Sequence, residues 1–155
     1  MSAISLVQID ESEFAEFMEA TLPSYSRARA EADRVSFETA ESEARRQQKE
    51  ILPKGIATPG HHFFRITTAD GQNVGSVWLG INPNSSSAYV YDIVVAEDHR
   101  RKGYASGAME LVHEFARKAG CARIGLNVFE PNTSAQVLYL KLGYAVGSLY
   151  MSKPL

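Results

Sequence analysis

The feature of the sequence that most restricts the fold is the segment 88–96, AYVYDIVVA, in which Asp92 is the only charged side chain. Tyr, Val and Ile, which are enriched in β-strands, make up most of it. A strand this apolar cannot leave one face in water, so it predicts a sheet that is covered on both sides. The chain therefore has to combine this strand with layers that pack on each face.

The N-terminal part of the chain is predicted to be one strand followed by helices. Residues 4–9 have the composition of a short strand, and Asp10 with Glu13 three residues later resembles a capping box at a helix start. Pro23 is expected to interrupt that helix. Apolar side chains then recur at helical spacing over 24–48, which predicts one or two amphipathic helices that end before Pro53.

The remainder of the chain alternates between strand and helix patterns. Asp70-Gly71 separates two strand-like segments and predicts a hairpin. Two helices are predicted at about 104–119 and 133–142, each closed by a glycine, and two further strands at 122–129 and 144–152. This order predicts an α+β fold with a mixed, mostly antiparallel central sheet of about six or seven strands flanked by helices.

Length and composition indicate one ordinary globular domain. The 155 residues are 45% hydrophobic and 22% charged, and the formal net charge is -2. This balance gives no general attraction to nucleic acid or to an anionic membrane, and neither partner is expected. Cys121 is the only cysteine, so a disulfide framework is excluded. The N-terminus lacks the pattern of a secretory signal, and we expect a cytoplasmic protein.

The segment 97–105, EDHRRKGYA, places three cations where a helix is predicted to begin. A helix N-terminus is already positive, so cations there suggest an anionic ligand. Gly103 permits a left-handed backbone that lets a phosphate approach, and the small Ala105 leaves the first turn open. The segment matches neither the P-loop nor the dinucleotide-binding pattern. A solvated basic loop remains the alternative.

Two motifs in order extend this interpretation. Arg100-x-x-Gly103-x-Ala105 resembles the pyrophosphate-binding motif of the GNAT superfamily of N-acetyltransferases, and 126–144, LNVFEPNTSAQVLYLKLGY, resembles its strand, Asn-containing turn and Tyr-bearing helix. Arg101 departs from the motif, because many members have glycine there. The resemblance implies a single N-acetyltransferase domain, 1–155, with a variable substrate-side part at 1–62 and an acetyl-CoA-binding core at 63–155.

The resemblance also implies which residues hold coenzyme A, as a co-substrate and without a metal. Asn132 has a second interpretation as a helix N-cap, and Asn127 either faces water or lines the cleft between strands. The implied binding residues are Ile93, Val94, Val95, Arg100, Arg101, Lys102, Gly103, Tyr104, Ala105, Asn127, Asn132 and Ser134.

Asp92 and Tyr139 are the candidate catalytic residues. A carboxylate in a covered strand is costly unless it is paired, so Asp92 is either bound to a partner such as an arginine or is the base that deprotonates an amine. Glu97 competes for the role of base. Tyr139 continues an apolar helical stripe, yet by resemblance its hydroxyl is the acid that protonates the coenzyme A thiolate. His61 and His62 have no evident third ligand, and a substrate-side role stays open for them.

The expected activity is transfer of an acetyl group from acetyl-CoA to a primary amine, by direct attack in a ternary complex. The amine acceptor is a small molecule or a protein amine that the sequence does not identify. Two alternatives remain: a non-catalytic acyl-CoA-binding or sensor domain, and a general nucleotide- or phosphate-binding module. The oligomeric state is left open, with a homodimer among the options.

Overall fold

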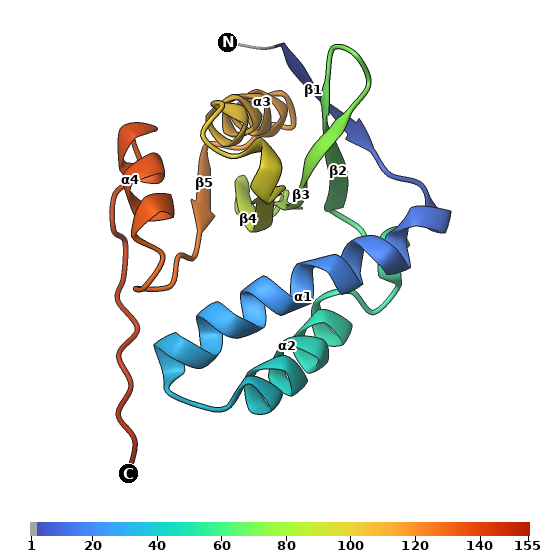
Figure 1. Cartoon of the computed structure of the whole chain (residues 1–155). Coiled ribbons are helices and arrows are strands. Elements are labelled where there is room, and N and C mark those ends of the chain that lie inside the picture. The colour runs from blue at the N-terminus through green and yellow to red at the C-terminus, as the bar shows by residue number, and fades with distance from the viewer. Residues whose placement is uncertain (1–2) are drawn as a thin grey trace. The chain divides into compact units, whose positions relative to one another are not determined.

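Residues 3–155 are described by a computed structural model and divide into two units. One unit contains residues 3–18 and 52–127, and the other contains residues 19–51 and 128–155. Helix α1, Glu11–Asp33, which is labelled in Figure 1, contributes residues 11–18 to the first unit and residues 19–33 to the second. No helix within residues 3–155 is both long enough and apolar enough to span a membrane.

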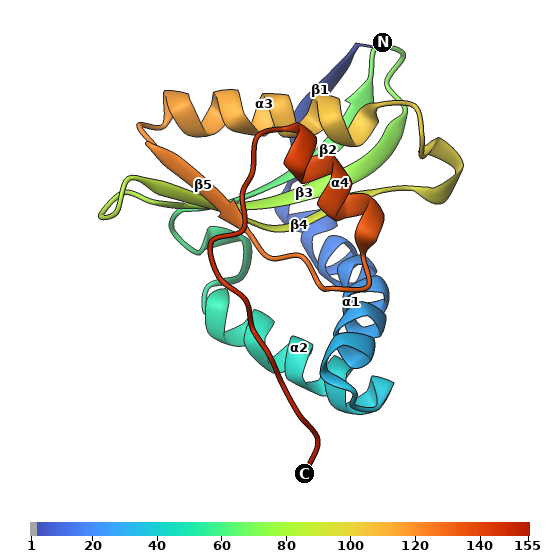
Figure 2. The same ribbon diagram turned by 90° about the vertical axis from the view of Figure 1, so that its left-hand side faces the viewer.

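The first unit is built on a five-stranded sheet in the order β1-β2-β3-β4-β5. The strands β1 to β4 pair antiparallel and β5 joins β4 in parallel, which confirms a mixed, mostly antiparallel sheet (Figure 2). The expected count of six or seven was too high for the residues that the structure describes. The strands are β1 Ile4–Gln8, β2 His61–Thr68, β3 Asn73–Asn82, β4 Ser87–Val95 and β5 Arg123–Leu126.

One face of this sheet packs against helix α3, Tyr104–Lys118, which lies along the strands in Figure 2. His62 and Phe64 on β2 contact the ring of Phe115 on α3, with ring centroids 4.9 and 5.3 Å apart. Because paired residues on neighbouring strands share a face, Val77, Leu79 and Val90 belong to the same face. We call it the helix face.

The opposite face carries aromatic side chains, and we call it the aromatic face. Phe63 on β2 meets Phe14 and Phe17 from the first turns of α1, with centroids 5.1 and 5.6 Å apart. Phe63 also stacks on Trp78 of β3, and Trp78 stacks on Tyr91 of β4. A row of rings thus crosses three strands within the first unit.

The second unit contains the rest of α1 together with α2, Phe37–Ile51, and α4, Thr133–Lys141. Arg45 on α2 bonds Glu19 on α1 at 2.7 Å, and the Gln48 amide donates to the Thr21 hydroxyl at 3.2 Å. The Phe129 ring contacts Tyr25 at a centroid distance of 5.4 Å. Polar and aromatic contacts therefore link α1 to α2 and to the segment before α4.

Pro23 does not interrupt α1, contrary to the prediction from sequence. Proline lacks the N–H that would bond the carbonyl four residues earlier, which weakens a helix interior. Its neighbours Leu22 and Ser26 are 2% and 0% exposed. Burial of this side of the helix outweighs the lost hydrogen bond.

The predicted strand at 144–152 is also absent, and 122–129 contributes only β5. Residues 144–155 form neither helix nor strand, and Val146, Leu149 and Tyr150 are 73–84% exposed. An extended segment becomes a strand only when a neighbour accepts its backbone hydrogen bonds. No described residue forms a strand pair with this segment.

Candidate active site

The centre of β4 contains a bulge. Asp92 lies opposite Trp78 on β3 and Val90 lies opposite the next residue, Leu79, so Tyr91 is an extra residue on β4. A bulge bends its strand and changes the direction of the side chains beside it. Tyr91 and Asp92 consequently both accompany Trp78 on the aromatic face, since Tyr91 stacks on Trp78 and Asp92 is its direct pair.

The second half of β4 has an unpaired edge. β5 pairs with Ser87–Val90 only, whereas β4 continues to Val95. Within the described residues, 91–95 therefore have β3 on one side and no strand on the other. The predicted binding residues Ile93, Val94 and Val95 lie on this stretch, where backbone groups remain available to an extended ligand.

The loop after β4 leads into an uncapped helix. The Arg100 Nε donates to the Val95 carbonyl at 3.1 Å and ties the loop to the end of β4. Gly103 is the N-cap of α3 with φ +81°, and it provides no side-chain cap. The first turn of α3 lacks intrahelical acceptors for its N–H groups, as in any helix. These N–H donors and the exposed Arg101 and Lys102 fit an anionic group of pyrophosphate type.

Arg101 has φ +63°, in the left-handed region that favours glycine. This is the position where the sequence departs from the motif. The backbone there adopts the conformation that glycine would adopt with less strain, and the side chain adds a cation to the loop. The departure thus adds charge and makes the loop less flexible than a glycine would.

One carboxylate oxygen of Asp92 is buried without a hydrogen-bond partner in the described part of the chain. Its Oδ2 is inaccessible and has no hydrogen-bond partner among the described residues, although the residue as a whole is half-buried. Of the two interpretations that the sequence left open for Asp92, the arginine partner is wrong for the part of the chain that the structure describes, because no ion pair there involves Asp92. Burial raises the pKa of Asp92 from 3.8 to about 7. A carboxyl with this pKa can exchange a proton at neutral pH.

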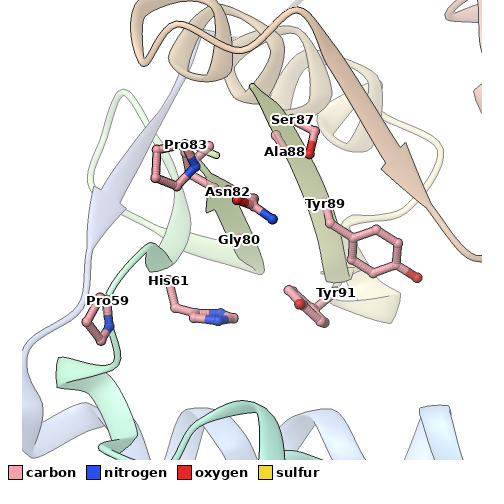
Figure 3. Close-up of a pocket in the computed structure, with 10 residues that line it drawn as sticks. Pro59, His61, Gly80, Asn82, Pro83, Ser87, Ala88, Tyr89 and Tyr91 are labelled. Carbon is pink, nitrogen blue, oxygen red and sulfur yellow. The ribbon is translucent and has the colours of Figure 1, made fainter. Parts of the chain in front are cut away.

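A pocket of about 480 Å³ opens on the aromatic face beside the start of β4. Figure 3 shows His61 and Tyr91 extending into the same space from β2 and β4, with Tyr89 next to them. The sequence singled out His61 for a substrate-side role but missed the two tyrosines. Their spacing of two along a strand places them on one side, and that spacing is the clue the sequence carries.

The comparisons with known proteins identify the family of this chain. The family model described as "Acetyltransferase (GNAT) family" matches residues 15–144. The chain belongs to the GNAT family.

Two Bacillus subtilis proteins named as uncharacterized N-acetyltransferases resemble this GNAT chain over nearly its full length. YycN is 29% identical over 154 residues, 98% of this chain and 99% of YycN, and YdgE is 29% identical over 155 residues, 99% of each. The crystal structure of YycN has a TM-score of 0.91 and covers 99% of both chains. Aminoglycoside N(6')-acetyltransferase type 1 of Serratia marcescens is 29% identical over 65% of this chain and 71% of its own.

The second GNAT motif, 126–144, begins at the last residue of β5 and continues through α4. The Asn132 side chain accepts from the Ala135 N–H at 3.3 Å, which confirms its interpretation as the N-cap. Ser134 and Asn132 are exposed, and Asn127 lies exposed just after the end of β5, outside the strand in which it was predicted. Tyr139 is buried, and its ring contacts Tyr144 at 5.6 Å.

Proposed function

We propose that this GNAT protein transfers an acetyl group from acetyl-CoA to a primary amine by direct attack in a ternary complex. The observation that carries the proposal is the unpaired edge of β4 leading into the uncapped, cationic start of α3. An extended ligand with a pyrophosphate at one end needs this succession of open backbone and anion site. Family membership supplies the reaction class.

We assign proposed binding residues to the pyrophosphate and to the pantetheine arm of coenzyme A. The pyrophosphate takes the N–H groups and cations of Arg100–Ala105, and the pantetheine arm runs along Ile93–Val95. Asn127, Asn132 and Ser134 are proposed contacts to the same arm. Acetyl-CoA, when bound, supplies the acyl thioester.

The proposed chemistry uses two side chains. The amine nitrogen forms a bond to the thioester carbonyl carbon while Asp92 accepts the proton that the nitrogen loses. A carboxyl whose pKa is about 7 is ionised in a large fraction of molecules at pH 7 and is a stronger base than an ordinary aspartate. The C–S bond then breaks, and Tyr139 donates its hydroxyl proton to the departing thiolate.

Gly103→Val tests the pyrophosphate site. Valine has a Cβ that disfavours φ +81° and fills the approach to the helix start. We expect calorimetric affinity for coenzyme A to fall by at least about tenfold, roughly 1.4 kcal/mol. The matched control is Gly120→Val at the other end of α3, where φ is +87° and a Cβ would meet no atom within 4 Å. It imposes similar strain away from the loop and should leave affinity unchanged.

An unchanged affinity in folded Gly103→Val protein would refute the site. Binding of coenzyme A without release of free thiol from acetyl-CoA, with any amine of a broad panel, would favour the non-catalytic acyl-CoA-binding alternative. Competition by ATP as strong as that by desulfo-coenzyme A would favour the general phosphate-binding module.

Tyr139→Phe tests the proposed acid. A thiolate is a tolerable leaving group, so we expect turnover to fall at the low end of the range for acid–base catalysis, about 10²-fold. Affinity for acetyl-CoA should stay constant, since the ring is retained. Intact turnover with reduced thermal stability would make Tyr139 a packing residue.

A further inference from the structure

The pocket on the aromatic face has no assigned ligand, and its lining combines aromatic and polar side chains. Its lining includes His61, Asn82, Ser87, Tyr89 and Tyr91 (Figure 3). Among the described residues that line it there is no Asp, Glu, Lys or Arg. The wall is thus aromatic and hydrogen-bonding but carries no fixed charge.

The aromatic side chains of the aromatic face form a continuous cluster of ring contacts. Tyr91 stacks on Trp78 with centroids 4.6 Å apart and an interplanar angle of 20°. Tyr89 meets Tyr91 edge-to-face at 4.8 Å, and the His61 ring lies 5.3 Å from Tyr91. Rings held by each other at these distances present a rigid surface that favours a flat apolar body.

The state of His61 follows from its contact with Trp78. The Trp78 Nε1–H donates to His61 Nδ1 at 3.0 Å, so Nδ1 carries no hydrogen. Burial lowers the pKa of His61 below 6.5, which keeps the ring neutral at pH 7. Its hydrogen is therefore on Nε2, and His61 offers a neutral N–H donor.

Asp92 is the residue after Tyr91, which lines the pocket, but Asp92 itself is not a lining residue. Asp92 follows Tyr91 in β4 and lies opposite Trp78, and its Oδ2 is unpartnered. One residue of a strand spans about 3.3 Å, so the carboxylate is within a short chain's reach of a ring that stacks on Tyr91. An amine that extends past Tyr91 to Asp92 would meet a carboxylate, while the rest of its molecule lies against uncharged rings.

We propose that this pocket binds the acceptor, and that the acceptor is an arylalkylamine: a primary amine on a short alkyl chain attached to an uncharged aromatic ring. This inference rests on the proposed acetyl transfer. A polyamine or aminosugar brings further ammonium groups, and each would lose water without gaining a charged partner in the pocket. An arylalkylamine brings one, which meets Asp92.

The wild-type protein gives a binding test that needs no turnover. Trp78 is the only tryptophan of the chain, so its fluorescence reports on the aromatic face directly. We expect saturable quenching by phenethylamine and none by spermidine. Acetylation should follow the same order, with kcat/KM for phenethylamine at least tenfold above that for spermidine or kanamycin.

Substitutions of Tyr91 then test whether the aromatic cluster binds the acceptor. Tyr91→Ala should raise KM for phenethylamine about tenfold with KM for acetyl-CoA unchanged, and Tyr91→Phe, which keeps the ring, should restore it. Tyr150→Ala is the matched control, because Tyr150 is 84% exposed. A KM that Tyr91→Ala leaves unchanged would overturn the inference.

The outcomes separate this inference from the proposed function. Quenching by phenethylamine without acetylation of any amine keeps the pocket's ligand class and rejects acetyl transfer. Acetylation that prefers spermidine, with no quenching by phenethylamine, keeps acetyl transfer and rejects the arylalkylamine acceptor.

Discussion

The helix face and the aromatic face of the sheet are made by alternate residues of the same strands, yet they differ in what they bury. On the helix face, Val77 and Leu79 are 0% exposed and Val90 is 4% exposed, and none has a side-chain polar atom. On the aromatic face, Trp78 and Tyr91 carry polar atoms, and Asp92 holds a buried oxygen without a partner. One face is optimised for packing, and the other tolerates a costly group.

From this difference we expect stability to depend mainly on the helix face and the proposed chemistry to depend on the aromatic face. Burying apolar surface stabilises the fold, whereas burying an unpartnered carboxyl costs free energy in its ionised form. Sites of catalysis commonly retain such unfavourable groups because their chemistry needs them. Substitutions on the two faces should therefore separate into losses of stability and losses of turnover.

The largest expected effect is on turnover, from Asp92→Asn. Asparagine keeps the shape but cannot accept a proton, so we expect kcat to fall about 10³-fold, within the range of acid–base catalysis. Steady-state release of coenzyme A measures it. Glu97→Gln, which removes an exposed carboxylate of the following loop, is the control and should be near wild type. Equal losses in the two variants would contradict the assignment of Asp92.

Substitutions on the helix face should instead lower the free energy of unfolding. Leu79→Ala removes a fully buried side chain and leaves a cavity, which should cost about 3 kcal/mol of unfolding free energy. Urea denaturation measures the loss, and kcat per folded molecule should be unchanged. Val137→Ala, at an exposed position of α4, should cost less than about 0.5 kcal/mol. A large loss of kcat in folded Leu79→Ala protein would show that the two faces are not independent.

The pH dependence of stability should contain a contribution from Asp92 that the Asp92→Asn variant lacks. Its pKa is raised from 3.8 to about 7 on folding, so between these values the native state binds more protons than the unfolded state. Stability contributed by this group therefore falls as pH rises, by about 2 kcal/mol between pH 5 and pH 7. Asp92→Asn should remove that part of the slope in urea titrations. An identical slope in both proteins would mean that Asp92 titrates normally.

The smallest expected effect, on both the free energy of unfolding and the pKa of His61, is from Trp78→Phe. Phenylalanine keeps the stacking but loses the Nε1–H that bonds His61, which should cost about 1 kcal/mol of stability. Nδ1 of His61 becomes available to a proton, and the pKa of His61 should rise towards its usual value. NMR titration of the imidazole measures this. A His61 pKa that stays where it was would show that burial alone sets it.

Local features of the site could be predicted from the sequence. Gly103 at the start of α3, Gly120 after its end and the Asn132 cap all depend on residues within one helical turn, and each was placed correctly. The Asp70-Gly71 hairpin is equally local, because its turn fixes which strands pair. The cationic loop before α3 could also be predicted, because its charged residues are adjacent in the sequence.

The other features of the site depend on contacts between residues that are distant in the sequence. The bulge at Tyr91, the early end of β5 and the placement of Asp92 opposite Trp78 depend on strand register, which short-range patterns do not encode. Pro23 lies inside a helix because burial of its neighbours outweighs its propensity. The sequence by itself determined the motif, the ends of α3 and α4 and the cationic loop before α3. Only the tertiary structure decided that Asp92 lacks a partner and that the rings form a pocket, since both depend on contacts between distant residues.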